Sequence, residues 1–113
     1  MSRAVFHLEV SDDDGAPTPY EVTVTGEVDA SNVVQFTRSV QDLPGARPII
    51  LELSKVKYLD SAGFAALDRL LAENAVVIVL SPDSFMYRVA ELMCMPLHHA
   101  VEAARRVLQD GAS

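Results

Sequence analysis

The sequence lacks most of the features that mark specialised classes of protein. It contains one cysteine, no tryptophan and five isolated glycines in 113 residues. The single cysteine, Cys94, cannot form an internal disulfide, and no apolar run approaches the ~20 residues that a membrane-spanning helix needs. The N-terminus has no signal-peptide pattern, because His7 and Glu9 interrupt its short apolar stretch. These absences predict a cytoplasmic protein.

Positive charge is also scarce. Nine Lys and Arg residues stand against 16 Asp and Glu residues, which gives a net charge of −7. Binding to nucleic acid or to an anionic membrane depends on clustered basic residues, so both partners are disfavoured. Half of the residues are apolar, which predicts one soluble domain over residues 1–113. Other proteins are therefore the expected partners.

Catalytic and metal-binding patterns are missing as well. No glycine-rich loop is present to hold a phosphate, so nothing supports nucleotide binding, a cofactor or enzyme activity. The segment Asp12–Gly15 lacks the alternating ligand spacing of a calcium loop and is interpreted as a hairpin tip. His98 and His99, on one helix, would point about 100° apart and make a poor metal site. Cys94, between two methionines, is expected in or near the core.

The hydrophobic pattern predicts alternating strands and helices. Strands are expected at residues 4–10, 20–28, 49–53 and 75–80. Helical stripes are formed by Val33, Phe36, Val40 and Leu43; by Phe64, Leu67, Leu70 and Leu71; by Phe85, Val89, Leu92 and Met93; and by Ala100, Val101, Ala104 and Leu108. Asp29 or Ser31 is expected to cap the first helix, and Ser81 the third, with Pro82 at its first position.

This order predicts an α/β fold. An N-terminal hairpin joins strand–helix–strand units, which imply parallel pairing and right-handed crossovers. The expected architecture is a small sandwich, with helices packed over a mixed sheet. Functional residues of such sheets lie just beyond the carboxyl ends of the strands. The segments "GEVDAS" (residues 26–31) and "YLDSAG" (residues 58–63) both fall there.

The "YLDSAG" segment places a serine where a helix begins. One interpretation is helix capping, in which the Ser61 hydroxyl or the Asp60 carboxylate accepts exposed amide hydrogens. The other is that Ser61 is modified, since a phosphate at a helix N-terminus meets unpaired amides and the positive end of the helix dipole. "DSAG" is not the nucleophile elbow of a hydrolase, and no histidine has a context that would place it nearby.

The segment "PIILELSKVKYLDSAGFAALDRLL" (residues 48–71) resembles the centre of STAS domains, the fold of bacterial anti-sigma factor antagonists. "GEVDASN" (residues 26–32) is similar to the family's Gly-Glu-Leu-Asp segment, and residues 77–97 resemble its following strand, turn and helix. The likeness covers about residues 5–108 and implies a STAS-like sandwich.

The resemblance also implies a phosphorylation-controlled partner switch. The unmodified antagonist binds an anti-sigma factor that is an ATP-binding serine kinase, and thereby releases a sigma factor for transcription. The kinase then phosphorylates the antagonist, and a PP2C-type phosphatase resets it. By motif position the phosphoacceptor is Ser61. The implied partner-binding residues are Asp29, Ser31, Ser54, Asp60, Ser61, Ala62 and Gly63.

Two departures keep other functions open. Only residues 64–74 separate the motif from the next strand, and the C-terminal region shows no clear short strand before its last helix. The chain also fits the STAS subunit of a bacterial lipid-transport ABC ATPase. A scaffold subunit of a stress-sensing complex, modified at both Ser54 and Ser61, is a third interpretation. A weak homodimer is compatible with the sequence.

Overall fold

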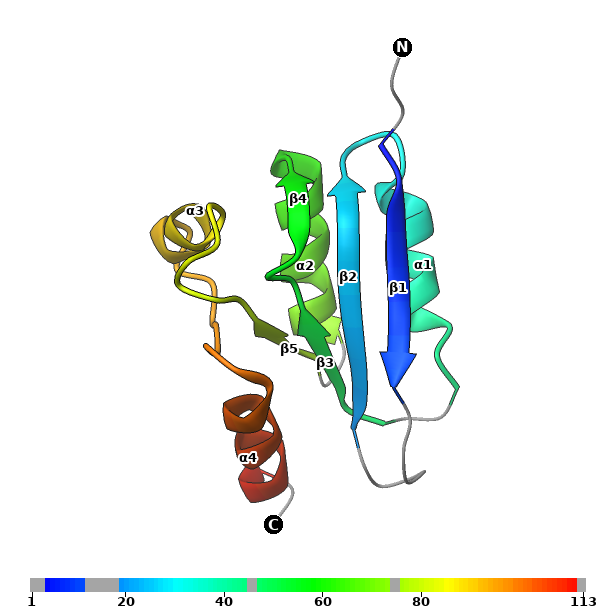
Figure 1. The fold of residues 1–113 in the computed structure, drawn as a ribbon. Coiled ribbons are helices and arrows are strands. Elements are labelled where there is room, and N and C mark those ends of the chain that lie inside the picture. The colour runs from blue at the N-terminus through cyan, green and yellow to red at the C-terminus, as the bar shows by residue number, and fades with distance from the viewer. Residues whose placement is uncertain (1–3, 12–18, 45–46, 74–75, 112–113) are drawn as a thin grey trace.

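The structure, a computed structural model, describes residues 4–11, 19–44, 47–73 and 76–111. In chain order the elements are β1 (Phe6–Ser11), β2 (Tyr20–Val28), α1 (Val33–Gln41), β3 (Ile49–Glu52), β4 (Val56–Leu59), α2 (Ser61–Glu73), β5 (Val76–Val79), α3 (Tyr87–Leu92) and α4 (Val101–Gly111). The strands form one mixed sheet in the order β1-β2-β3-β5, and β4 also pairs with β2 (Figure 1). The predicted α/β fold is confirmed.

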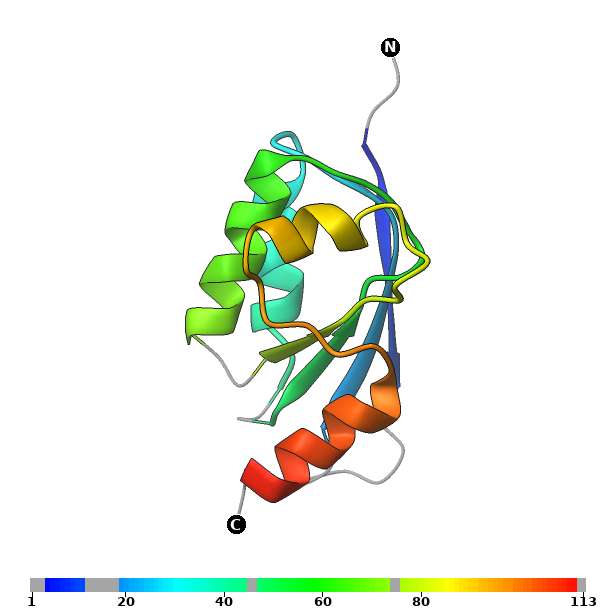
Figure 2. The ribbon, with the colours of Figure 1, turned by 90° about the vertical axis from the view of Figure 1, so that its left-hand side faces the viewer.

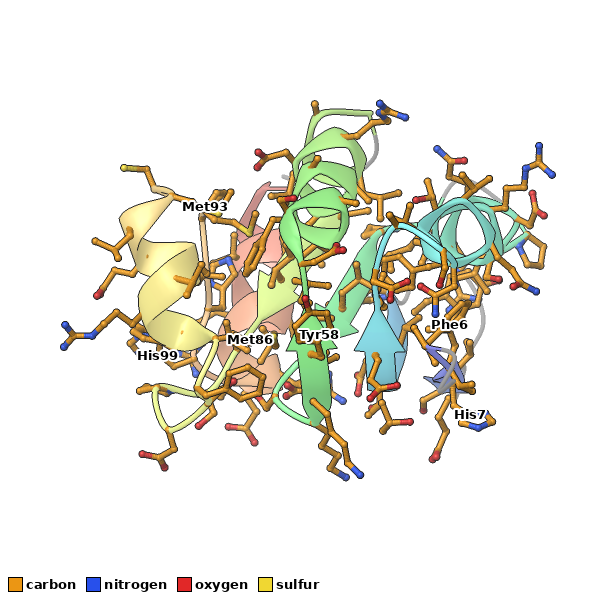
Figure 3. The ribbon with its side chains drawn as sticks, turned by 90° about the horizontal axis from the view of Figure 1, so that it is seen from above. Phe6, His7, Tyr58, Met86, Met93 and His99 are labelled. Atoms are coloured by element: carbon orange, nitrogen blue, oxygen red, sulfur yellow. The ribbon has the colours of Figure 1, made fainter. Side chains whose placement is uncertain are left out.

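The N-terminal hairpin forms as expected. β1 and β2 pair in antiparallel register from Phe6 opposite Gly26 to Ser11 opposite Glu21. Val22 and Val24 are fully buried on the sheet face that α1 and α2 cover, as the alternation of β2 predicts. In the view from above, Phe6 lies toward α1 and His7 points away from it (Figure 3). The predicted hairpin tip, with Asp12–Gly15, lies outside the described residues.

Gly26 marks an irregularity in β2. Its φ is +92°, a backbone conformation that residues with a side chain rarely adopt. An added Cβ would also lie 2.2 Å from the carbonyl oxygen of Val5. At this point the pairing of β2 with β4 shifts register, between Gly26 and Glu27. The irregularity lets the end of β2 change its course just before the turn that follows.

One strand was missed by the sequence analysis. β3 pairs with β2 and β5, and after a turn the chain continues as β4, which pairs with the far end of β2. Val56 in β4 is buried, whereas Lys57 and Tyr58 next to it are both exposed. In the sequence the segment is only four residues long, and the adjacent Tyr58 and Leu59 break the alternation of apolar and polar residues that signals a half-buried strand, so no strand was predicted here.

Helices cover both faces of the sheet, but not equally. α1 and α2 lie side by side on one face, and α4 lies on the other (Figure 2). The predicted stripes of α1 and α2 pack into the main core. Ala104 of α4 packs against Ile50 and Val79, which are buried on the opposite face. The prediction that the strand at 49–53 is covered on both sides is therefore confirmed.

The third helix differs from the prediction. Neither Ser81 nor Pro82 starts it: residues 81–86 form turns, and α3 begins at Tyr87 after Met86, with no side-chain cap. The predicted apolar stripe faces outward, and its members are exposed by 64% (Phe85), 45% (Val89), 77% (Leu92) and 46% (Met93). Met86, Ala90 and Met95 are buried in its place.

Two further expectations near the C-terminus are wrong. Cys94 is exposed, because it ends α3 with a φ of 56°, while Met95 N–H bonds to the Ala90 carbonyl and Cys94 N–H to the Glu91 carbonyl. His98 and His99 do not share a helix. His98 forms a one-residue parallel bridge with Val79. This bridge lies in the region before the last helix, where the sequence shows no clear short strand. His99 Nε2 lies 2.8 Å from the Tyr87 hydroxyl.

In the described part of the chain, no helix combines the length and the apolar character needed to cross a membrane.

Candidate functional site at the ends of β2 and β4

The two segments chosen from the sequence meet at one edge of the sheet. β2 and β4 are parallel neighbours, with Val28 opposite Leu59, so the turns that follow them leave the sheet side by side (Figure 1). The Ala30 N–H donates a hydrogen bond to Asp60 Oδ2 at 3.2 Å, and Asp60 N–H lies 3.4 Å from the Val28 carbonyl oxygen. Both segments follow the carboxyl ends of strands, as predicted, and the structure adds that their turns are in direct contact.

Asp60 is the residue that caps α2. Its Oδ1 accepts a hydrogen bond from the Gly63 N–H at 3.0 Å, and its carbonyl accepts the first helical bond, from Phe64 N–H. This is the geometry of a side-chain N-cap. Because Oδ2 holds Ala30 at the same time, one carboxylate fixes both the start of the helix and the position of the neighbouring turn.

Ser61 is therefore not needed as a cap. It is the first residue of α2, it is exposed, and its hydroxyl makes no hydrogen bond to any residue that the structure describes. The N–H groups of the first helical turn have no partners within the helix, and Asp60 occupies only that of Gly63. Asp60 thus provides the capping predicted by the first interpretation of the motif. The Ser61 hydroxyl has no role in the fold among the described residues.

Gly63 has a steric role in the motif. A Cβ on this residue would lie 2.4 Å from Leu59 Cδ1, 2.8 Å from Leu59 Cγ and 3.3 Å from the Val28 carbonyl oxygen. The absence of a side chain lets the first turn of α2 pack directly on the ends of β4 and β2. Gly63 is buried, so it shapes the site from below, whereas Ala62 is half-buried at the surface.

Asp29 and Ser31 form a closed turn and do not cap α1, which corrects the prediction. Asp29 Oδ1 accepts hydrogen bonds from the Ser31 N–H at 2.8 Å and from the Ser31 hydroxyl. The hydroxyl, followed by the two backbone N–H groups of Ser31 and Asn32, holds the pKa of Asp29 below its ordinary value of 3.8, against a smaller opposing effect of desolvation. The site therefore carries a carboxylate at neutral pH.

Asn32 is a site residue that the sequence analysis missed. Its Oδ1 accepts from the Asp29 N–H at 2.9 Å, and its Nδ2 donates to the carbonyls of Ala4 and Glu27, both at 3.0 Å. One buried amide thus joins the N-terminal segment, the end of β2 and the turn before α1. The signal in the sequence is an asparagine directly before a helical stripe, next to the two residues, Asp29 and Ser31, that were predicted as caps.

Ser54 does not belong to the same cluster. It lies in the turn between β3 and β4, and all of β4 separates it from Asp60. Its Oγ accepts a hydrogen bond from the Ser81 N–H at 2.8 Å, and its own N–H donates to Glu52 Oε1 at 2.8 Å. This half-buried hydroxyl ties two loops together, in contrast to the Ser61 hydroxyl.

The chemistry of this edge favours recognition. Among the described residues, no group of three or more His, Cys, Asp and Glu side chains is arranged to hold a metal ion. The side chains of Asp29, Asp60 and Asn32 accept hydrogen bonds from backbone N–H groups of the two turns. The edge offers an exposed hydroxyl at a helix N-terminus, flanked by negative charge.

The mixed sheet, with two crossover helices on one face and a capped serine turn at the ends of its strands, defines an α/β sandwich domain. The model of the STAS domain family matches residues 8–93, and the chain belongs to this family.

Solved structures agree with this assignment. The crystal structure of an anti-sigma factor antagonist from Mycobacterium paratuberculosis is 20% identical and matches 90% of this chain and 95% of its own, with a TM-score of 0.67. The structure of the anti-sigma factor antagonist SpoIIAA in its unphosphorylated form is 16% identical, covers 91% and 97% of the two chains, and has a TM-score of 0.60. These likenesses show the fold. No curated protein matches the chain in sequence.

Proposed function

We propose that the protein is an anti-sigma factor antagonist controlled by phosphorylation of Ser61. In its unmodified form it binds an anti-sigma factor that carries an ATP-binding serine kinase domain, and this capture releases a sigma factor. Phosphorylation by the kinase ends the complex, and a PP2C-type phosphatase restores it. In this role the protein is a cytoplasmic binding module and not an enzyme. The observation that carries the proposal is the exposed hydroxyl of Ser61, which capping by Asp60 leaves without a structural task.

The position tolerates a phosphate. A phosphate on Ser61 would sit at the N-terminus of a helix of 13 residues, where backbone N–H groups and the helix dipole favour negative charge. The hydroxyl has no described hydrogen bond to lose, and the cap on Gly63 comes from Asp60. The modification therefore leaves the fold intact and changes only the surface.

The change in that surface is large. A phosphate adds about −1.5 to −2 charges beside the Asp60 carboxylate. A charge pair ~4 Å apart near a protein surface is worth ~1–4 kcal/mol, depending on screening. Repulsion of this size across an interface weakens a complex by roughly ten- to a thousandfold. A partner that approaches Ser61 with its own negative groups would then be released.

The test is a paired capture experiment. Wild-type protein and the Ser61→Asp variant serve as baits in a lysate of the organism that encodes the chain, and protein purified from the same cells is mapped for phosphate. We expect the wild type to retain an ATP-binding kinase-like protein, the aspartate variant to lose it, and phosphate to be found on Ser61. Ser61→Ala should bind like the wild type and resist release by ATP.

Ser39→Asp is the matched control, because it adds the same charge on α1, away from the motif. It should retain the partner. Equal capture of a transport ATPase by all baits would contradict the switch and indicate the lipid-transport subunit instead. Phosphate on both Ser54 and Ser61 would indicate the stress-sensing scaffold, although Ser54 Oγ is already bonded to the Ser81 N–H.

A further inference from the structure

A groove runs between the outer faces of α1 and α2, beside the serine turn. It has a volume of about 430 Å³. The described residues that line it are Val33, Val34, Thr37, Arg38 and Gln41 of α1, and Ala62, Ala65, Ala66 and Arg69 of α2. The helices α1 and α2 lie next to each other in the view from above (Figure 3). Ala62, which lines the groove, directly follows Ser61 at the start of α2.

The floor of the groove is apolar and made of small side chains. On α2 the groove is lined by three alanines, at positions 62, 65 and 66, whose side chains are single methyl groups. Ala65 is exposed. On α1, Val34 is 63% exposed, so a large apolar side chain stands open to water at the rim. Small residues at helical spacing let another helix approach closely, at the 8–10 Å axial distance of packed helices.

The charge in the groove is of one sign. The two charged residues that line it are Arg38 and Arg69, and neither makes an ion pair or a side-chain hydrogen bond with any described residue. The chain as a whole has a net charge of −7, so the two arginines are opposite in sign to the overall charge of the protein. Nearby Asp42 and Asp68 do not line the groove. Charge complementarity therefore selects a negatively charged occupant.

The form of the occupant follows from hydrogen bonding. An extended peptide needs backbone partners along its length, but the backbone groups of α1 and α2 are used within their own helices. A helix satisfies its own backbone groups and buries only one face. From Ala62 to Arg69 the groove is about 10 Å long, at 1.5 Å per residue, which matches two turns of a helix.

We propose that the groove between α1 and α2 binds an acidic amphipathic helix of a partner protein. The apolar face of that helix rests on the three alanines and Val34, and its carboxylates pair with Arg38 and Arg69. The inference does not depend on phosphorylation of Ser61, which lies beside one end of the groove. A partner seated there would also reach the serine turn, through Ala62.

The test uses a designed probe. An 18-residue amphipathic peptide, with leucine and alanine on one face and glutamate on the other, is titrated into isotope-labelled protein and followed by NMR and fluorescence anisotropy. We expect amide shifts at the groove residues of both helices. Arg38→Glu combined with Arg69→Glu should weaken binding about tenfold or more, and raising the salt concentration should weaken the wild-type complex.

Matched variants separate the groove from general surface effects. Ala65→Leu fills the groove and should abolish binding, whereas Ala72→Leu makes the same change on an exposed residue of α2 outside it. Arg106→Glu on α4 controls for charge. The proposal is wrong if the peptide does not bind at millimolar concentration, if a lysine version binds equally well, or if the shifts fall on the exposed stripe of α3 instead.

Discussion

Helices α2 and α3 carry apolar residues at similar helical spacing, yet only one of the two stripes is buried. Leu67 and Leu70 of α2 are at most 1% exposed, whereas Leu92 of α3 is 77% exposed. α2 connects β4 to β5, two parallel strands of the sheet, so both of its ends are fixed and its apolar side must face the sheet. α3 follows β5, the last strand in the order, and lies beyond that edge of the sheet (Figure 1). Spacing predicts a helix, and topology decides which face is covered.

The sharpest way to break this comparison is to shorten one leucine in each helix. Leu67→Ala should lower the free energy of unfolding by about 2–5 kcal/mol, because it removes a buried side chain and leaves a cavity. Leu92→Ala should change it by less than about 0.5 kcal/mol. Urea denaturation of both variants measures the difference. Equal losses would mean that the stripe of α3 is buried in solution.

The start of α2 depends on a missing side chain. Gly63→Ala should destabilise the protein by about 1–3 kcal/mol, because the added methyl group overlaps Leu59. The double variant Gly63→Ala with Leu59→Ala should recover part of this loss, since it removes the atoms that clash. Thermal unfolding with calorimetry measures both. An unchanged stability of the single variant would mean that Leu59, at the end of β4, moves to make room for the added methyl group.

The cap of α2 has no counterpart in α3. Asp60→Ala should cost about 0.5–2 kcal/mol, since the Gly63 N–H loses its acceptor. The Ala30 N–H loses its partner as well, so the amide exchange of both turns should rise together. Hydrogen exchange measured by NMR reports this coupling. An effect confined to α2 would contradict the role of Asp60 in joining the two turns.

The end of α3 lacks the glycine that its backbone conformation favours, whereas α2 has a glycine where its packing requires one. Cys94 has a φ of 56° and makes the hydrogen bonds that commonly accompany a glycine after a helix. Cys94→Gly should raise the free energy of unfolding by up to about 1 kcal/mol, because relief of the left-handed conformation (about 1–2 kcal/mol) exceeds the entropic cost of glycine (about 0.5–1 kcal/mol). Cys94→Val should lower it, because a β-branched side chain is strained at this φ. Chemical denaturation measures the sign. Destabilisation by glycine would show that the thiol itself contributes to packing.

Much of the fold could be predicted from local patterns. The hairpin, the two crossover helices and the position of two polar segments at the carboxyl ends of strands follow from alternation, helical spacing and the parallel order of the strands. β4 was missed because it is only four residues long and its apolar residues Tyr58 and Leu59 are adjacent, which breaks the alternation typical of a strand. The inward face of α3 was also missed, because residues 81–86 turn before the helix begins.

The site was predicted less completely than the fold. The position of Asp60 and Ser61 at the start of a helix was predicted, because such a motif is local in sequence, whereas their role in binding a partner stays a prediction. Asn32 escaped attention because its three partners come from Ala4, Glu27 and Asp29, and no local pattern brings these groups together. The basic groove was also hidden, since it exists only where two helices lie side by side.

The single bridge between Val79 and His98 has a consequence for solubility. The segment "AVVIVL" that contains β5 is uncharged and rich in β-branched residues, the composition that stacks into intermolecular sheets when its edge is open. The His98 N–H bonds to the Ile78 carbonyl and the His98 carbonyl accepts from the Leu80 N–H, so a loop occupies backbone groups that another chain would seek. The pairing of His98 with β5 thus occupies backbone groups through which this strand could pair with another chain.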